Sequence, residues 1–170
     1  MSDKVYNILV LCTGNSARSI MAEALFNSIG KGRFKAYSAG SHPAGKVNAF
    51  ALEQIQKLDY PTAALRSKSW DEFASADAPP MDFVITVCDK AAGEICPVWP
   101  GQPITAHWGF EDPGVSGTDE EKRQSFQKVF NFIMNRVRLF SNLPLEKLDS
   151  MAIKREMDHI GAIQDTHESV

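Results

Sequence analysis

The amino-acid sequence predicts an α/β domain in which a parallel sheet carries helices on both faces. The first observation is an alternation along the chain, in which strand-like segments are followed by segments with the apolar period of helices. The second is the run at residues 83–87, because a continuous β-branched stretch is typical of a strand buried on both faces of a parallel sheet. A chain of 170 residues is long enough for one domain with a sizeable core.

Four apolar segments are expected to form the sheet. The predicted strands are residues 5–11, 34–39, 83–87 and 104–108. Cys12 and Cys88 each follow one of these strands directly, and Gly40 closes another. Ligands of such sheets bind at the carboxyl ends of the strands, so we expect both cysteines at the ligand-binding edge.

Helical segments occupy most of the remaining chain. The predicted helices are residues 18–29, 48–58, a short one over 69–74 capped by Ser69, a long one behind Thr118, and a last one over 145–160. Thr118 and Glu121 form a capping box for the long helix. Its apolar stripe comprises Phe126, Val129, Phe130, Ile133, Val137 and Phe140.

The last helix has a weak pattern. Its predicted stripe runs through Leu148, Met151 or Ala152, and Arg155, with Gly161 as its stop. A helix docked on the domain and an arm that faces a partner both fit this pattern.

The loop between the first strand and the first helix carries the strongest chemical signal. Five residues separate Cys12 from Arg18, and Ser19 follows. Backbone N–H groups of such a loop converge on an anion, as does the N-terminus of the following helix, and both favour a thiolate at Cys12. Arg18 suits two oxygens of a tetrahedral oxyanion because its guanidinium is planar and bidentate. The expected anion-binding residues are Thr13, Gly14, Asn15, Ser16, Ala17 and Arg18, with Gly14 and Asn15 suited to positive φ.

Composition excludes several classes of protein. A net charge of −3 and a pI near 5.8 argue against a surface for nucleic acid or anionic membranes. The sequence has no stretch approaching the ~20 apolar residues of a membrane span, and we expect a cytoplasmic protein. The three cysteines are then expected to be thiols, and the four scattered histidines predict no metal site.

The loop at residues 12–19 resembles that of the low-molecular-weight tyrosine phosphatase superfamily. Residues 88–97, Cys-Asp-Lys-Ala-Ala-Gly-Glu-Ile-Cys-Pro, and 107–113, His-Trp-Gly-Phe-Glu-Asp-Pro, resemble the paired-cysteine segment and the acid loop of arsenate reductases with that fold. The resemblance implies a flavodoxin-like three-layer sandwich with four parallel strands. It also implies reduction of arsenate to arsenite for arsenic detoxification, with phosphate or sulfate as mimics of the substrate. We expect residues 1–143 to form this domain and 144–170 to be a helical extension of it.

In this interpretation Cys12 attacks arsenic, and Asp112 is the general acid for the departing oxygen. Cys88 then takes the sulfur from arsenic and expels arsenite. We hypothesise that the disulfide passes from Cys12–Cys88 to Cys88–Cys96, and that thioredoxin, or alternatively glutaredoxin, recycles the enzyme without any bound cofactor. A helix over 89–95 would hold the Cα atoms of Cys88 and Cys96 roughly 12 Å apart, whereas a disulfide needs about 4.4–6.8 Å. This segment must therefore unwind before the bond can form.

Further residues near the loop have predicted roles. Ser19 is expected to donate a hydrogen bond to the Cys12 sulfur and lower its pKa, and Asn15 to support the loop. Asn15, Glu23 and Ser38 match the potassium site of some family members, but Lys68 stands where those members have an Asp, which predicts no potassium dependence. The large aromatic residues are expected to anchor the core or loops: Trp99, Trp108 and Phe110.

Two rival functions remain open from the sequence. A phosphatase acting on phosphotyrosine or a small phosphoester would use Cys12, Arg18 and Asp112 in the same way, but it has no use for Cys88 and Cys96. No pair of tyrosines follows Pro113 to wall a phosphotyrosine pocket. A redox sensor, the second rival, would form its disulfide as readily with peroxide and would not need Asp112.

Overall fold

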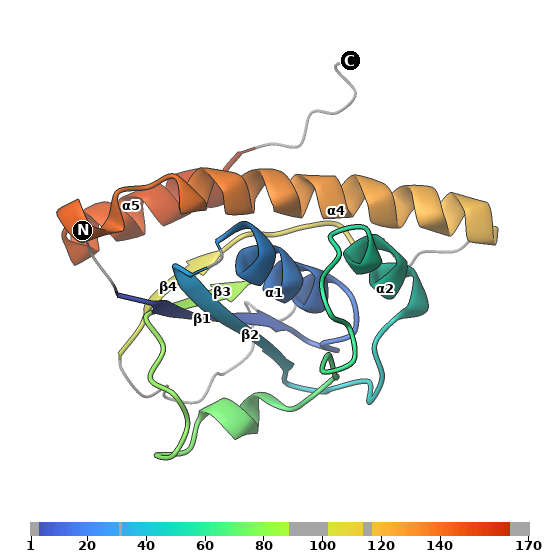
Figure 1. Ribbon diagram of the computed structural model, residues 1–170, viewed down its shortest axis with the longest axis horizontal. Helices are drawn as coiled ribbons and strands as arrows, with labels where there is room; N and C mark the ends of the chain where they lie inside the picture. The colour runs from blue at the N-terminus through green and yellow to red at the C-terminus, as the bar shows by residue number, and fades with distance from the viewer. Residues whose placement is uncertain (1–3, 31, 89–101, 114–116, 164–170) are drawn as a thin grey trace.

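The computed structural model describes residues 4–30, 32–88, 102–113 and 117–163. Its sheet is parallel, with strand order β2-β1-β3-β4 (Figure 1). The strands are β1 (Tyr6–Cys12), β2 (Phe34–Gly40), β3 (Phe83–Thr86) and β4 (Ile104–His107). Each predicted strand is confirmed to within one residue at either end.

The helices follow the labels of Figure 1. They are α1 (Arg18–Ile29), α2 (Ala49–Gln56), η1 (Trp70–Phe73), α4 (Asp119–Ser141), η2 (Leu145–Lys147) and α5 (Ser150–Gly161). The capping box of α4 is confirmed, because Glu121 N donates to Thr118 Oγ1 at 3.1 Å and Thr118 N donates to Glu121 Oε1 at 2.8 Å. None of the helices in the described ranges is both long and apolar enough to cross a membrane.

The sheet separates two packed layers. On one face lie α1, α4 and α5, with α2 packed against α1 and α4 (Figure 1). Within the described ranges the other face is covered by η1, whose Phe73 packs with Leu9 and Leu11 of β1. The fold is therefore the α/β arrangement that the sequence predicts.

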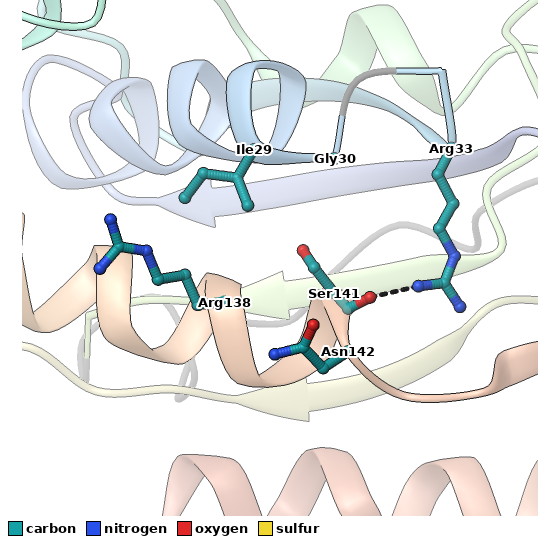
Figure 2. A pocket seen from close by; sticks show the side chains of 6 residues that line it. All are labelled: Ile29, Gly30, Arg33, Arg138, Ser141 and Asn142. Carbon is teal, nitrogen blue, oxygen red and sulfur yellow. Dashed lines mark hydrogen bonds between the residues drawn. The ribbon is translucent and has the colours of Figure 1, made fainter.

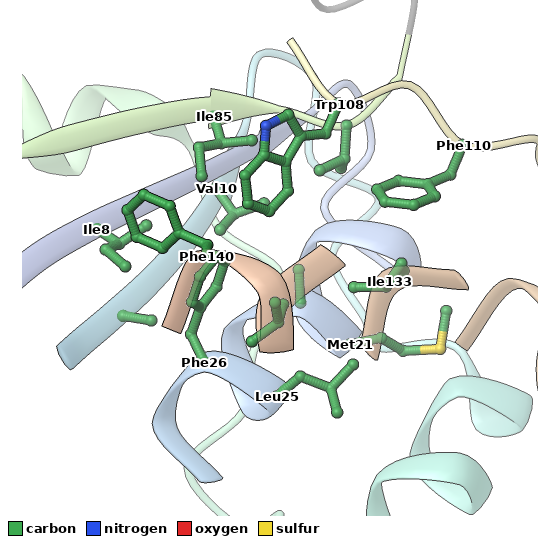
Figure 3. Packing of buried hydrophobic residues seen from close by; sticks show 14 of the residues in the cluster. Ile8, Val10, Met21, Leu25, Phe26, Ile85, Trp108, Phe110, Ile133 and Phe140 are labelled. Atoms are coloured by element: carbon green, nitrogen blue, oxygen red, sulfur yellow. The ribbon is translucent and has the colours of Figure 1, made fainter. Parts of the chain in front are cut away.

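The larger core lies between the sheet and α1 and α4 (Figure 3). The ring of Phe140 on α4 meets Phe83 edge-on at 5.2 Å, and Trp108 lies 6.0 Å from Phe26 of α1. Every residue of the predicted α4 stripe is buried, and Trp108 and Phe110 are buried anchors as expected. Trp99 lies outside the described residues. Arg136 also belongs to the buried face of α4, which the apolar pattern did not predict.

The C-terminal segment corrects the sequence prediction. Residues 145–160 do not form one helix, because η2 ends at Lys147 and α5 begins only after Asp149, whose side chain accepts a 2.8 Å hydrogen bond from Ala152 N. The predicted stripe is wrong, since Met151 is 75% exposed and Arg155 is also exposed. The face that packs on β4 and α4 comprises Ile153, Met157 and Ile160. Helix α5 is docked on the domain.

The strand order creates a crevice at the carboxyl edge of the sheet. From β1 the chain crosses to β2 on one side, and β3 pairs with β1 on the other. The loops that leave β1 and β3 therefore diverge at this point, where ligands of open α/β sheets bind. Cys12 is the last residue of β1, and Cys88 follows β3.

Candidate active site

A cavity of about 470 Å³ opens at this edge of the sheet. Its lining residues are Cys12, Thr13, Gly14, Arg18, Cys88, Phe110, Glu111 and Asp112. The structure thus brings together the predicted nucleophile, the predicted anion-binding arginine, the predicted second thiol and the predicted acid. Cys96 lies outside the described residues, as does the segment predicted to unwind.

Carbonyl groups of the loop after β1 point away from the cavity. Thr13 O accepts a hydrogen bond from His42 N and Gly14 O accepts one from Ala44 N, both at 2.9 Å. Ser16 O accepts from Asn48 N at 2.8 Å. Because the C=O and N–H of a trans peptide point in opposite directions, these bonds turn the following N–H groups toward the inside of the loop. The loop therefore has the form of an anion nest.

Helix α1 begins at this loop without a side-chain cap. Its N-cap is Ala17, and its first turn contains no acidic residue. By contrast, α2, α4 and α5 are capped by Asn48, Thr118 and Asp149. The positive N-terminal end of α1 is therefore left for a ligand in the loop.

Asn15 supports the loop, as the sequence predicted. It is fully buried and has a φ of 45°. Its Nδ2 donates to Ser19 Oγ and its Oδ1 accepts from Lys68 N, both at 2.9 Å. Gly14 does not adopt the positive φ expected of it.

Gly40, at the end of β2, allows the loop to pass close to the sheet. A Cβ atom at this position would lie 2.4 Å from Thr13 O and 2.7 Å from Cys12 O. Backbone oxygens cannot yield without moving the loop, so only glycine fits here. The sequence marked Gly40 as the end of a strand but carried no signal for this close approach.

The two described cysteines form a pair of buried thiols. Their hydrogen bond is the main cause that raises the pKa of Cys12, followed by burial, while Arg18 and the backbone of Thr13 act to lower it. Thr13 Oγ1 lies 3.7 Å from Cys88 Sγ. The expected lowering of the Cys12 pKa is therefore wrong for this arrangement, because the sequence did not reveal that the two thiols compete for one negative charge.

Ser19 differs from its predicted role. Its hydroxyl accepts the hydrogen bond from Asn15, and no hydrogen bond to Cys12 is present among the described residues. Ser19 is fully buried at the start of α1. It fixes Asn15 and thereby the shape of the loop.

The loop after β4 forms the opposite wall of the cavity. Arg18 Nη1 donates a 2.9 Å hydrogen bond to Phe110 O, which joins the anion loop to this wall. Asp112 is exposed and lines the cavity beside Glu111, which pairs with Lys128 at 3.4 Å. A carboxyl group thus lies at the mouth of the site.

Lys68 lies where the resemblance places it, next to Glu23 and the loop. Its ammonium is 3.9 Å from Glu23 Oε1 and donates to Arg66 O at 3.0 Å. Ser38 Oγ donates to the same Glu23 oxygen at 2.5 Å. Burial raises the pKa of Glu23 and lowers that of Lys68, and each charge opposes the shift of the other. In the parts of the chain that the structure describes, no three His, Cys, Asp or Glu side chains gather as a metal site requires.

A second cavity, of about 430 Å³, lies at the C-terminal ends of α1 and α4 (Figure 2). There Arg33 donates hydrogen bonds to Ser141 O and Leu143 O. Ser141 is the last residue of α4, where carbonyl groups lack partners within the helix, so Arg33 completes the end of that helix. We assign this cavity to packing.

A Cys-x5-Arg-Ser nest at the edge of a parallel sheet defines the class: proteins that bind a tetrahedral oxyanion over a nucleophilic cysteine. The chain belongs to the low molecular weight phosphotyrosine protein phosphatase family, whose model matches residues 7–156.

Two of the curated relatives are arsenate reductases. The chain is 38% identical to an arsenate reductase of Oceanobacillus iheyensis over 142 residues, which is 83% of this chain and 97% of the relative. An arsenate reductase of Bacillus subtilis is 37% identical, with the same coverage.

Three solved structures that match this chain are also arsenate reductases. An arsenate reductase from Archaeoglobus fulgidus superposes with a TM-score of 0.62 at 31% identity, covering 80% of this chain and 99% of that one. An arsenate reductase in the phosphate binding state has a TM-score of 0.65 at 26% identity, covering 80% and 96%. A thioredoxin-dependent arsenate reductase from Corynebacterium glutamicum has a TM-score of 0.55 at 25% identity, covering 81% and 61%.

Proposed function

We propose that the protein reduces arsenate to arsenite for arsenic detoxification. The observation that carries this proposal is the presence of two buried free thiols, Cys12 and Cys88, in the lining of one anion-binding cavity. A phosphatase needs only the first thiol. The arsenate reductases among the relatives support the same conclusion.

Arsenate binds first, in the nest and against Arg18. The Cys12 thiolate attacks arsenic, a covalent sulfur–arsenic bond forms, and one oxygen leaves as water after it takes a proton from Asp112. Arg18 and the backbone of Thr13 act to lower the pKa of Cys12 against burial and Cys88, so they favour the thiolate that attacks. No oxidation occurs in this step.

Reduction follows when Cys88 loses its proton and attacks the Cys12 sulfur. A Cys12–Cys88 disulfide forms, the sulfur–arsenic bond breaks, and its electron pair stays on arsenic, which leaves as arsenite. Two thiols are oxidised and arsenic gains two electrons. The buried position of Cys88, at 4% exposure, supports a partner inside the protein for this step and not a thiol from solution.

We propose that Cys96 completes the relay. Its thiolate attacks Cys88, forms Cys88–Cys96 and releases Cys12 as a thiolate. A dithiol protein of the thioredoxin class then reduces the new disulfide, as the name of the Corynebacterium glutamicum relative supports. Since the relay must start from three reduced thiols, we place it in the cytoplasm.

The test treats the fully reduced protein with arsenate in the absence of oxygen, counts free thiols and maps disulfides by mass spectrometry, with phosphate as the control anion. We expect two thiols to disappear with arsenate alone and the bond to lie between Cys88 and Cys96. Cys96→Ser should release arsenite once, stop at Cys12–Cys88 and fail to cycle with thioredoxin. Cys88→Ser should release none.

Other outcomes would favour one of the two rival functions, the phosphatase or the redox sensor. Intact thiols after arsenate, together with steady hydrolysis of an aryl phosphate, would establish a phosphatase. Equal oxidation by peroxide and arsenate, unaffected by Asp112→Asn, would establish a sensor. Full cycling of Cys96→Ser with thioredoxin would refute the relay while leaving arsenate reduction intact.

A further inference from the structure

Arg136 is a charged residue in a core position. It lies on the buried face of α4 between Ile133 and Phe140, and only 1% of its surface is exposed. Its Nη1 donates to Phe132 O at 3.3 Å, and its Nη2 donates to Ile163 O just beyond α5. Burial of a guanidinium is costly, so the contacts that hold it here indicate a role beyond filling space.

This guanidinium lies over the ring of a residue that lines the active-site cavity. Arg136 Cζ lies 4.8 Å from the centre of the Phe110 ring, within the range of a cation–π interaction. The main chain of Phe110 belongs to the cavity, because its carbonyl accepts the hydrogen bond from Arg18 and its N–H donates to Val87 O at 3.2 Å. Asp112 is two residues further along. The ring of Phe110 is therefore the inner anchor of the segment that carries the predicted acid.

Trp108, on the other side of Gly109, lies in the same buried cluster as Phe110 (Figure 3). Its Nε1 donates to Met157 O of α5 at 3.0 Å. A Cβ at Gly161 would lie 2.9 Å from Trp108 Cδ1 and 2.4 Å from His107 O, so the end of α5 touches the base of the acid loop. Both aromatic anchors of residues 109–112 thus depend on α4 and α5. Gly161 and Ile163 lie beyond the segment that matches the family model.

We propose that Arg136 is a positioning residue that links the end of α5 to the acid loop. Held by the Ile163 carbonyl, its planar guanidinium fixes the Phe110 ring, and the ring fixes Asp112 over Cys12 and Arg18. The proposal rests on the proposed function in one respect, the role of Asp112 as proton donor. Lysine cannot replace this side chain fully, since it lacks the planar group that stacks on a ring while donating along its edge.

The experiment is a double-mutant cycle between Arg136 and Asp112. Arg136→Met keeps the length and apolar stem of the side chain, and Arg136→Lys keeps the charge. The matched control is Arg138→Met, which removes an exposed arginine from the same helix, at the rim of the second cavity (Figure 2). Each variant is measured at saturating substrate with arsenate and with 4-nitrophenyl phosphate, whose hydrolysis needs the acid but not Cys88.

We expect Arg136→Met to lower the rate with either substrate by roughly 10- to 100-fold, the cost of a misplaced acid, with a much smaller change in KM. In the Asp112→Asn background the same change should cost less than about 2-fold, because coupled residues are not additive. Arg136→Lys should recover part of the loss, and Arg138→Met should match the wild type.

Equal losses in the two backgrounds would overturn the proposal, because they would mean a general effect on folding. A loss in Arg138→Met as large as that in Arg136→Met would overturn it for the same reason. Should Arg136→Met fail to fold, the cycle with Arg136→Lys decides by the same criterion of additivity. A wild type that hydrolyses the aryl phosphate with the expected coupling but does not reduce arsenate would refute the proposed function and leave this inference standing.

Discussion

The hydroxyl oxygen of Thr13 lies 3.7 Å from the sulfur of Cys88. This contact joins the anion loop after β1 to Cys88, two residues beyond the end of β3, at the point where the two connections of the sheet diverge. Cys12 is the residue before Thr13, so the two thiols approach each other beside the anion nest and not merely on the same edge of the sheet. The reactivity of Cys12 therefore depends on Cys88.

Removing Cys88 should make Cys12 more acidic. The hydrogen bond with Cys88 is the largest cause of the raised Cys12 pKa, and Arg18 and the Thr13 backbone, which lower it, stay in place. In Cys88→Ala the alkylation of Cys12 by iodoacetamide should therefore begin at a lower pH than in the wild type. The measurement is the rate of Cys12 alkylation against pH, with the site identified by mass spectrometry.

Cys96→Ser is the control for this shift, because it also removes one thiol. It should leave the pH dependence of Cys12 unchanged. An identical profile in Cys88→Ala and the wild type would show that the thiol pair does not govern the pKa of Cys12.

Gly40→Ala should abolish anion binding while most of the fold remains. The added Cβ would meet Thr13 O at 2.4 Å and Cys12 O at 2.7 Å, so the loop must shift by a distance that typically costs ~100-fold in rate. Phosphate should no longer protect Cys12 from alkylation. Ser41→Ala, the neighbouring change, is the control and should keep that protection; a protected, active Gly40→Ala would contradict the close approach.

Local signals in the sequence predicted much of this molecule. Helix α1 begins and ends where its apolar period predicts, and the α4 capping box needs only Thr118 and Glu121, three residues apart. The spacing of Cys12 and Arg18 likewise defined the anion loop, because the whole motif lies within seven consecutive residues. These features depend on neighbours in the chain, which the sequence shows directly.

Features that depend on distant segments could not be predicted in this way. The raised pKa of Cys12 requires Cys88, which is 76 residues away in the chain. The register of α5 was misjudged because Met151 and Met157 are equally apolar, and only contact with β4 and α4 decides which is buried. Arg136 lies on the buried face of α4, but the predicted apolar stripe is complete without it, so the sequence carried no signal of its buried position.

Potassium should not activate this protein. The Lys68 ammonium lies beside Glu23 and Ser38, whose oxygens would otherwise face a cation. Replacing sodium chloride with potassium chloride at equal ionic strength should leave the rate unchanged, whereas Lys68→Asp should create a dependence on potassium. Lys57→Asp, which makes the same change of charge at an exposed site, should not. A clear rise in wild-type activity with potassium would contradict this role of Lys68.

Gly161→Ala should loosen α5 from the domain. Alanine in a helix normally gains up to about 1 kcal/mol over glycine, but here the new Cβ would meet His107 O at 2.4 Å and Trp108 at 2.9 Å. Overpacking of this kind costs about 1–3 kcal/mol, so the free energy of unfolding should fall. Urea unfolding followed by tryptophan fluorescence measures the change, with Ser150→Ala at the exposed start of α5 as control.

Because the same contact supports the acid loop, the variant should also lose activity under conditions in which it is fully folded. A variant that is more stable than the wild type and fully active would mean that the end of α5 does not bear on His107 and Trp108.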